Sequence, residues 1–192
     1  RQQPTPNPCR RMRKDELYDY TFTEFKALPV EERELYKAYG LRAGAKNLTG
    51  IDPTEWEWGR IKQIQDLVNK EYLWLTDIVE VVMVALDLKR EEVEQMKWFD
   101  IARFYTFILK AITEINTKEQ SLSYEPDAKE MNAGIEEFAR FSWFATLDRL
   151  AGGDILKYDE VGKQPWSIVF TKLLLNKTDA EFNKKLIKQS HV

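Results

Sequence analysis

Histidine and cysteine are almost missing from this chain of 192 residues, which has one of each. The histidine, His191, lies next to the last residue, where a chain end does not hold catalytic geometry. A Ser-His-Asp or Cys-His arrangement and a histidine-based metal site are therefore not expected. The cysteine, Cys9, cannot form a disulfide within the chain, so the fold does not depend on an oxidising compartment.

Nucleotide-binding glycine motifs are also missing, since neither G-x-G-x-x-G nor G-x-x-x-x-G-K-[ST] occurs. The longest apolar run, Ile78 to Leu86, is short and interrupted by Glu80, so no transmembrane helix is predicted. Acidic pairs such as Glu31-Glu32 fall in the first turns of predicted helices, where they favour the helix dipole rather than acid–base chemistry. We expect no enzyme, no cofactor, no metal and no membrane association.

Hydrophobic residues make up 43% of the chain, which is enough for it to fold around a core. Its 29 basic and 32 acidic residues leave a formal charge of −3, which gives no overall attraction to nucleic acid. Residues 1–14 differ from the rest, because alternating prolines precede the basic residues Arg10, Arg11, Arg13 and Lys14. This composition predicts an extended arm outside the core. It is either a leader without structure or a basic arm that contacts a neighbouring subunit or nucleic acid, and the sequence leaves both readings open.

Residues 15–120 show helical spacing and helix-start signals throughout. Asp52-Pro53-Thr54-Glu55 combines an N-cap, a proline in the first turn and a following acid. The β-branched stretch within Tyr72–Leu88 has no partner strand in the chain, so we interpret it as a buried helix. The predicted helices are 23–28 starting at a Thr23 cap, 29–40 ending at Gly40, 53–70, 72–88, 89–96 capped by Asp87, and 98–119.

A polar connector, residues 121–132, precedes a C-terminal helical part, residues 133–192, which we expect to fold together with residues 15–120. Apolar residues recur every three positions from Ile135 to Leu150, so on an α-helix this row would wind around most of the surface. Further helices are predicted from an Asp154 cap to Val161, over 166–175 until Asn176-Lys177, and from a Thr178 capping box with Phe182 and Leu186 inside. The prediction is an all-α bundle of about seven to eight helices with an N-terminal arm, and with more apolar surface than one small fold covers.

One segment bears a resemblance to a known class of proteins. The stretch from Phe141 to Val161 (FSWFATLDRLAGGDILKYDEV), followed by Pro165 and by Val169 to Leu174 (VFTKLL), resembles small helical assembly proteins of tailed bacteriophages. These include tail-assembly chaperones and neck or connector ring components. The resemblance implies a non-enzymatic protein of the virion or host cytoplasm that docks helices onto copies of itself and other virion proteins. The residues expected to make these contacts are Arg10, Arg11, Arg13, Trp143, Trp166 and Phe170.

The alternative is a cytosolic helical adaptor or regulator that contacts nucleic acid through the basic arm. Residues 155–175 have the outline of a helix-turn-helix, but the second helix offers only Ser167, Thr171 and Lys172 among apolar neighbours. A recognition helix needs several side chains that can bond base edges. Any contact with nucleic acid is therefore expected only through the arm.

Overall fold

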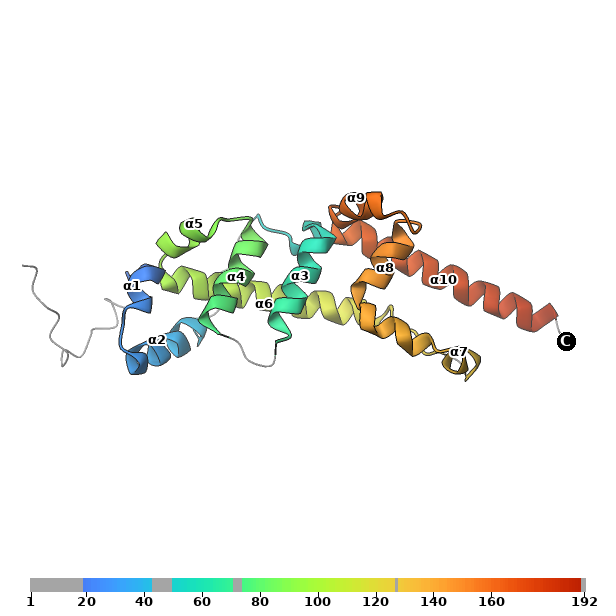
Figure 1. Cartoon of the computed structure of the whole chain (residues 1–192), viewed down its shortest axis with the longest axis horizontal. Coiled ribbons are helices and arrows are strands. Elements are labelled where there is room, and N and C mark those ends of the chain that lie inside the picture. The colour runs from blue at the N-terminus through green and yellow to red at the C-terminus, as the bar shows by residue number, and fades with distance from the viewer. Residues whose placement is uncertain (1–18, 43–49, 71–73, 127, 191–192) are drawn as a thin grey trace, which may run out of the picture. The chain divides into compact units, whose positions relative to one another are not determined.

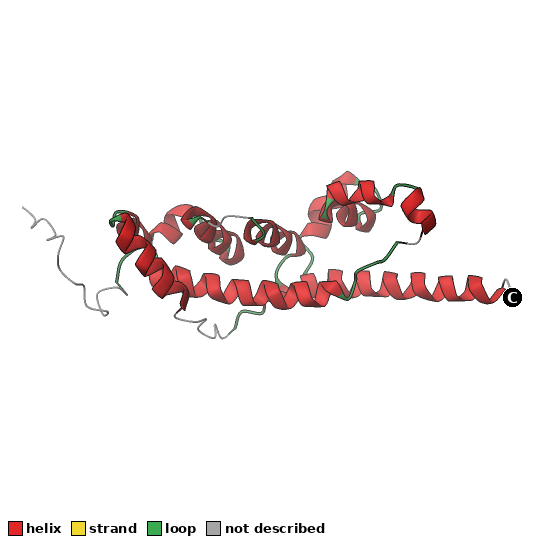
Figure 2. Ribbon diagram, turned by 90° about the horizontal axis from the view of Figure 1, so that it is seen from below, coloured by secondary structure: helices red, strands yellow, loops and turns green. Residues whose placement is uncertain are grey.

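The computed structural model describes residues 19–42, 50–70, 74–126 and 128–190, and within these ranges the chain forms helices and no strands (Figure 1 and Figure 2). The predicted all-α class is confirmed, whereas the predicted arm lies outside the described residues. The elements are α1 (Phe22–Lys26), α2 (Val30–Arg42), η2 (Pro53–Glu55), α3 (Trp58–Val68), α4 (Leu75–Leu86), α5 (Arg90–Gln95), α6 (Trp98–Gln120), α7 (Ala128–Asn132), η3 (Ile135–Phe141), α8 (Trp143–Leu150), η4 (Ile155–Lys157), α9 (Tyr158–Gly162) and α10 (Trp166–Ser190).

The contacts divide the chain into two compact units. Unit 1 contains the described residues 19–42 and 74–108, and unit 2 contains 50–70, 109–126 and 128–190. The division runs through α6, after Ile108, and not through the connector at 121–132. Each unit is described separately below.

The core of unit 1 is aromatic. Thr21 caps α1 in a reciprocal capping box with Glu24, two residues before the predicted Thr23 cap. The rings of Phe25 and Trp98 stack with centroids 4.4 Å apart, and Phe22 lies 6.0 Å from the same indole. All three side chains are buried. Short α1 is thus held mainly by packing, as expected for a helix too short to be stable alone.

Gly40 does not end α2 as predicted, because the helix continues to Arg42. A Cβ at position 40 would lie 2.9 Å from the Ala102 Cβ and 3.1 Å from Nε1 of Trp98. The glycine therefore allows α2 to approach α6 closely, and the indole N–H donates to the Tyr36 carbonyl, 3.3 Å away. Packing, rather than helix termination, explains this glycine.

The ambiguous β-branched stretch is helix, as predicted, and α4 buries Ile78, Val79, Val81 and Val82. Asp87 does not cap α5. It ends α4 in the left-handed conformation, with φ 55°, and its N–H donates to the Met83 carbonyl. Aspartate is one of the few residues that adopt this conformation readily, which gives it a role at the end of a helix as well as at the start.

Tyr105 of α6 is buried in unit 1, and this burial, together with the nearby charge of Asp77, raises the pKa of its phenol to about 12. The folded state therefore retains a proton that the unfolded chain releases near pH 10. We expect the contribution of Tyr105 to stability to be complete below pH 10 and to be lost as pH rises from 10 toward 12. Urea unfolding of wild type and Tyr105→Phe across this range should show a shallower decline in the variant. Equal slopes would contradict the assignment.

In unit 2, the Asp52 cap is confirmed, but the helix it starts is one turn of 3₁₀ helix, η2, and α3 begins only at Trp58. The Thr54 hydroxyl and backbone N–H both donate to the Asp52 carboxylate, and these bonds lower the pKa of Asp52. Glu57, with φ −53° and ψ 131°, lies outside the helix and pairs with Pro165 in an isolated antiparallel bridge. A contact distant in sequence thus interrupts the predicted helix.

The predicted single helix from Ile135 to Leu150 is two elements. Residues Ile135–Phe141 form the 3₁₀ helix η3, Ser142 has φ 50° and ψ −134°, and α8 starts at Trp143. A 3₁₀ helix has three residues per turn. The apolar row with a period of three therefore lies along one side of η3 instead of winding around it.

Asn176-Lys177 does not interrupt α10, and Thr178 does not cap a new helix. The Thr178 hydroxyl donates to the Leu174 carbonyl, and the Lys177 ammonium donates to the carbonyls of Ser121 and Ser123. Asparagine costs only tenths of a kcal/mol within a helix, so these contacts suffice to continue it. Phe182 and Leu186, predicted inside, are exposed.

The two units share one backbone arrangement. In unit 1 the first N–H groups of α1 and α6, from Phe22 and Trp98, donate to the carbonyls of Met96 and Tyr20, respectively, both at 2.8 Å. In unit 2 the first N–H groups of α3 and α10, from Trp58 and Trp166, donate to Gln164 and Trp56 at 2.8 and 2.9 Å. Helix starts leave such donors unpaired. In each unit, two helix starts satisfy one another through an isolated bridge, Thr21 with Lys97 and Glu57 with Pro165.

Candidate interaction site

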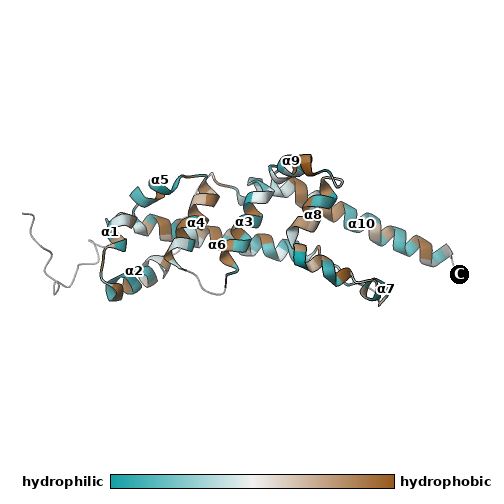
Figure 3. Cartoon of the chain, in the orientation of Figure 1, coloured by the Kyte–Doolittle hydropathy of each residue, from teal (hydrophilic) through white to brown (hydrophobic). Residues whose placement is uncertain are grey.

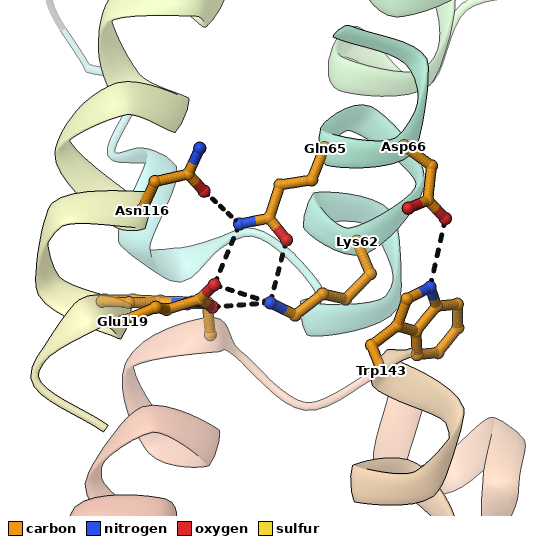
Figure 4. A network of polar contacts seen from close by, with 7 residues as sticks. Lys62, Gln65, Asp66, Asn116, Glu119 and Trp143 are labelled. Carbon is orange, nitrogen blue, oxygen red and sulfur yellow. Dashed lines mark hydrogen bonds and ion pairs between the residues drawn. The ribbon is translucent and has the colours of Figure 1, made fainter. Parts of the chain in front are cut away.

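Trp143 is anchored at the start of α8. Its indole N–H donates to the Asp66 carboxylate of α3, 3.1 Å away (Figure 4). Its ring meets Trp58 edge-on, with centroids 5.7 Å apart. The Phe144 ring stacks on the Trp143 ring, with centroids 4.1 Å apart. Trp143 is only half-buried. It therefore links the core of unit 2 to a phenylalanine at the surface.

That phenylalanine belongs to an exposed aromatic ridge, which we define as Phe138, Phe141 and Phe144. Their side chains are 61%, 47% and 52% exposed. Phe138 and Phe141 belong to the 3₁₀ helix η3, Phe144 belongs to α8 after the break at Ser142, and acidic Glu136 and Glu137 occupy the first turn of η3. The Arg140 guanidinium lies 4.8 Å from the centroid of the Phe141 ring. The result is an apolar row with charged side chains beside it.

A polar network connects α3, α6 and α10 in the same unit (Figure 4). The Lys62 ammonium contacts both oxygens of the Glu119 carboxylate at 2.7 and 2.8 Å, and the Gln65 amide donates to Glu119 at 3.0 Å and to Asn116 at 2.6 Å. The Trp166 indole N–H donates to Glu119 at 2.8 Å. One carboxylate thus accepts bonds from two other helices, and every donor named here has an acceptor. The arrangement is that of a satisfied structural network.

Trp166 and Phe170 have inward positions. Trp166 is 2% exposed, stacks on Phe170 at 4.8 Å, and has the Lys118 ammonium 5.6 Å from its ring. Phe170 is half-buried. These contacts make Trp166 a packing residue of unit 2. Arg10, Arg11 and Arg13, the other predicted contact residues, lie outside the described residues.

Sequence reasoning identified Trp143 but missed the ridge beside it. The period of three was visible, yet only the 3₁₀ conformation of η3 places Phe138 and Phe141 on the same side. Exposure depends on which neighbours cover a side chain, and no local signal reports this. Ile155 and Leu156 of η4, 72% and 87% exposed, were missed for the same reason.

In the residues that the structure describes, no helix has both the length and the apolar content to cross a membrane. No group of three or more His, Cys, Asp or Glu side chains is placed to hold a metal ion within those same ranges. Comparison with protein families, with curated proteins and with solved structures gives no match to this chain.

Proposed function

We propose that this protein is a non-enzymatic assembly component of a tailed-phage virion, either a neck or tail ring component or a tail-assembly chaperone, and that it acts by docking helices. The observation that carries the proposal is the aromatic ridge, whose three phenylalanines are each about half exposed. Single exposed apolar residues are ordinary, but three large exposed aromatics within seven residues of sequence are typical of a protein–protein interface.

The support beneath the ridge favours binding. Phe144 stacks on Trp143, which is held in turn by Asp66 and Trp58. A side chain that is already ordered loses little conformational freedom when a partner covers it. Anchored aromatics of this kind are the residues that dominate binding energy in measured interfaces. The phage context of the proposal comes from the resemblance of residues 141–174, which include Phe141, Phe144 and their support Trp143.

The proposal predicts that Phe138→Ser combined with Phe141→Ser abolishes binding to another structural protein encoded in the same phage genome. Both side chains are exposed, so the free energy of unfolding should change by only about 0.5 kcal/mol per site. Binding is measured by isothermal titration calorimetry with the purified partner, and folding by circular dichroism. The matched control, Ile155→Ser with Leu156→Ser, removes two apolar residues that are even more exposed elsewhere in unit 2 and should keep binding intact.

If both double variants lose binding equally, the ridge is not the binding surface. If no structural protein of the same genome binds, and DNA binds instead through Arg10, Arg11 and Arg13 with a steep salt dependence, the adaptor function replaces the assembly function.

A further inference from the structure

The long helix α10 is apolar on two opposite faces. Its inner face, Trp166, Val169, Phe170 and Leu173, is buried or half-buried in unit 2. Its outer face carries a second row, which we call the outer stripe: Ile168, Leu175, Phe182 and Leu186, each 47–59% exposed. At about 100° per residue these four positions fall within about 40° of one another, roughly opposite Trp166 and Phe170. Figure 3 shows the apolar bands continuing along α10 toward its C-terminal end.

Contacts along the inner face fix which way the stripe points. Trp166 bonds to Glu119, Lys177 to the carbonyls of Ser121 and Ser123, and Lys184 to the Tyr124 hydroxyl at 2.7 Å. These bonds are spread over the length of the helix and all lie on the side away from the stripe. Residues 168 to 186 span about 27 Å at 1.5 Å per residue. The stripe is therefore a long, straight surface held outward.

Charges beside the stripe indicate what covers it. Lys172 and Asp179, seven residues apart, lie on the same flank of the stripe, and neither has an ion-pair partner in the part of the chain that the structure describes. When two copies of a helix pack antiparallel, equivalent flanks face each other. Each Lys172 then lies opposite Asp179 of the other copy, which gives two ion pairs. The same register places Leu175 against Leu175 and Ile168 against Phe182.

A parallel pair would not use these charges. In a parallel pair, the flank with Lys172 and Asp179 would face the opposite flank of the partner helix, where Thr171 and Thr178 carry no charge. Ile168, Leu175, Phe182 and the two charges are thus self-complementary under a two-fold axis near Leu175, as a symmetric dimer interface requires. We propose that α10 pairs antiparallel with α10 of a second copy of this chain through the outer stripe. The pairing rests on the proposed function as an assembly protein and names a second copy as one partner.

Analytical ultracentrifugation of the full chain tests this proposal. Wild type should dimerise by about 0.1 mM, since one helix pair is at the small end of specific interfaces. Leu175→Asp should raise the dissociation constant at least about a hundredfold, because it places a charge at the centre of the apolar seam. Leu174→Asp is the matched control, being the neighbouring exposed leucine off the stripe, and should leave dimerisation unchanged. Circular dichroism checks that helix content is equal.

Charge reversals test the orientation. Lys172→Asp alone and Asp179→Lys alone should each weaken the dimer about tenfold, since two attractive pairs become repulsive. The double variant should restore wild-type affinity. A strictly monomeric wild type, equal effects of Leu174→Asp and Leu175→Asp, or a double variant without recovery would each overturn the antiparallel dimer. Binding to the phage structural protein through the ridge is measured separately. If the Leu175→Asp variant is monomeric and still binds that protein, the proposed function stands. If wild type is also monomeric, the antiparallel dimer is wrong, but the proposed function still stands.

Discussion

Replacing Trp98 with alanine is expected to lower the free energy of unfolding of the full chain by about 3 to 5 kcal/mol, the usual cost of truncating a buried aromatic residue. The indole is 2% exposed, stacks on Phe25 and donates to the Tyr36 carbonyl. Gly40 faces it without a side chain, so this position offers nothing to fill the space that alanine would leave. Urea unfolding followed by circular dichroism measures the effect.

The control for Trp98 lies in the same unit. Trp74 precedes α4 and is 69% exposed, so Trp74→Ala should change the free energy of unfolding by only about 0.5 kcal/mol. Similar losses in the two variants would mean that the aromatic cluster around Trp98 does not hold unit 1 together.

The second large effect concerns Glu119. Glu119→Ala should cost about 2 to 4 kcal/mol, because it leaves the Lys62 ammonium, the Gln65 amide and the Trp166 indole N–H competing for the acceptors that remain. The side chains of Lys62 and Glu119 are only 12% and 21% exposed, so water replaces the lost acceptor poorly. Thermal and urea unfolding of the full chain give the measurement.

Two further variants separate charge from hydrogen bonding at this site. Glu119→Gln keeps an acceptor but leaves Lys62 unpaired, and adding Lys62→Met should recover part of the stability because no buried charge then remains alone. Glu114→Ala, at an exposed position of the same helix, should change little. If Glu119→Ala also changes little, the network is not a stabilising element of unit 2.

Helix-start residues and apolar spacing predicted the structure correctly where the contacts involved are between residues close in sequence. Asp52 and Asp154 each accept a backbone N–H two residues later, which a short acidic side chain before a helical turn predicts. The regular apolar spacing of α6 and the length of α4 likewise identified buried helices. These features depend on residues a few positions apart, so the sequence contains what is needed to find them.

Errors arose where a distant contact overrides a local preference. Gly40 stays within α2 because it packs against Trp98, and Thr178 stays within α10, where the neighbouring Lys177 bonds carbonyls of residues 121 and 123. The candidate site was only partly predictable for the same reason. The aromatic character of Trp143 and Phe144 was evident, but which ring faces outward is decided by Trp58 and Asp66 on another helix.

The reciprocal pairing of helix starts has a consequence for the order of folding. In each unit the paired segments are distant in sequence: the Thr23 hydroxyl donates to the Glu94 carbonyl, 71 positions away, and the Ser167 hydroxyl donates to the Glu55 carboxylate, 112 positions away. Loops of this length must close before either helix start is satisfied, and such closure slows folding. During synthesis on the ribosome, the start of α1 should therefore stay unpaired until the start of α6 has emerged, and the start of α3 until that of α10 has emerged. Each unit should then become resistant to proteases in a late, cooperative step.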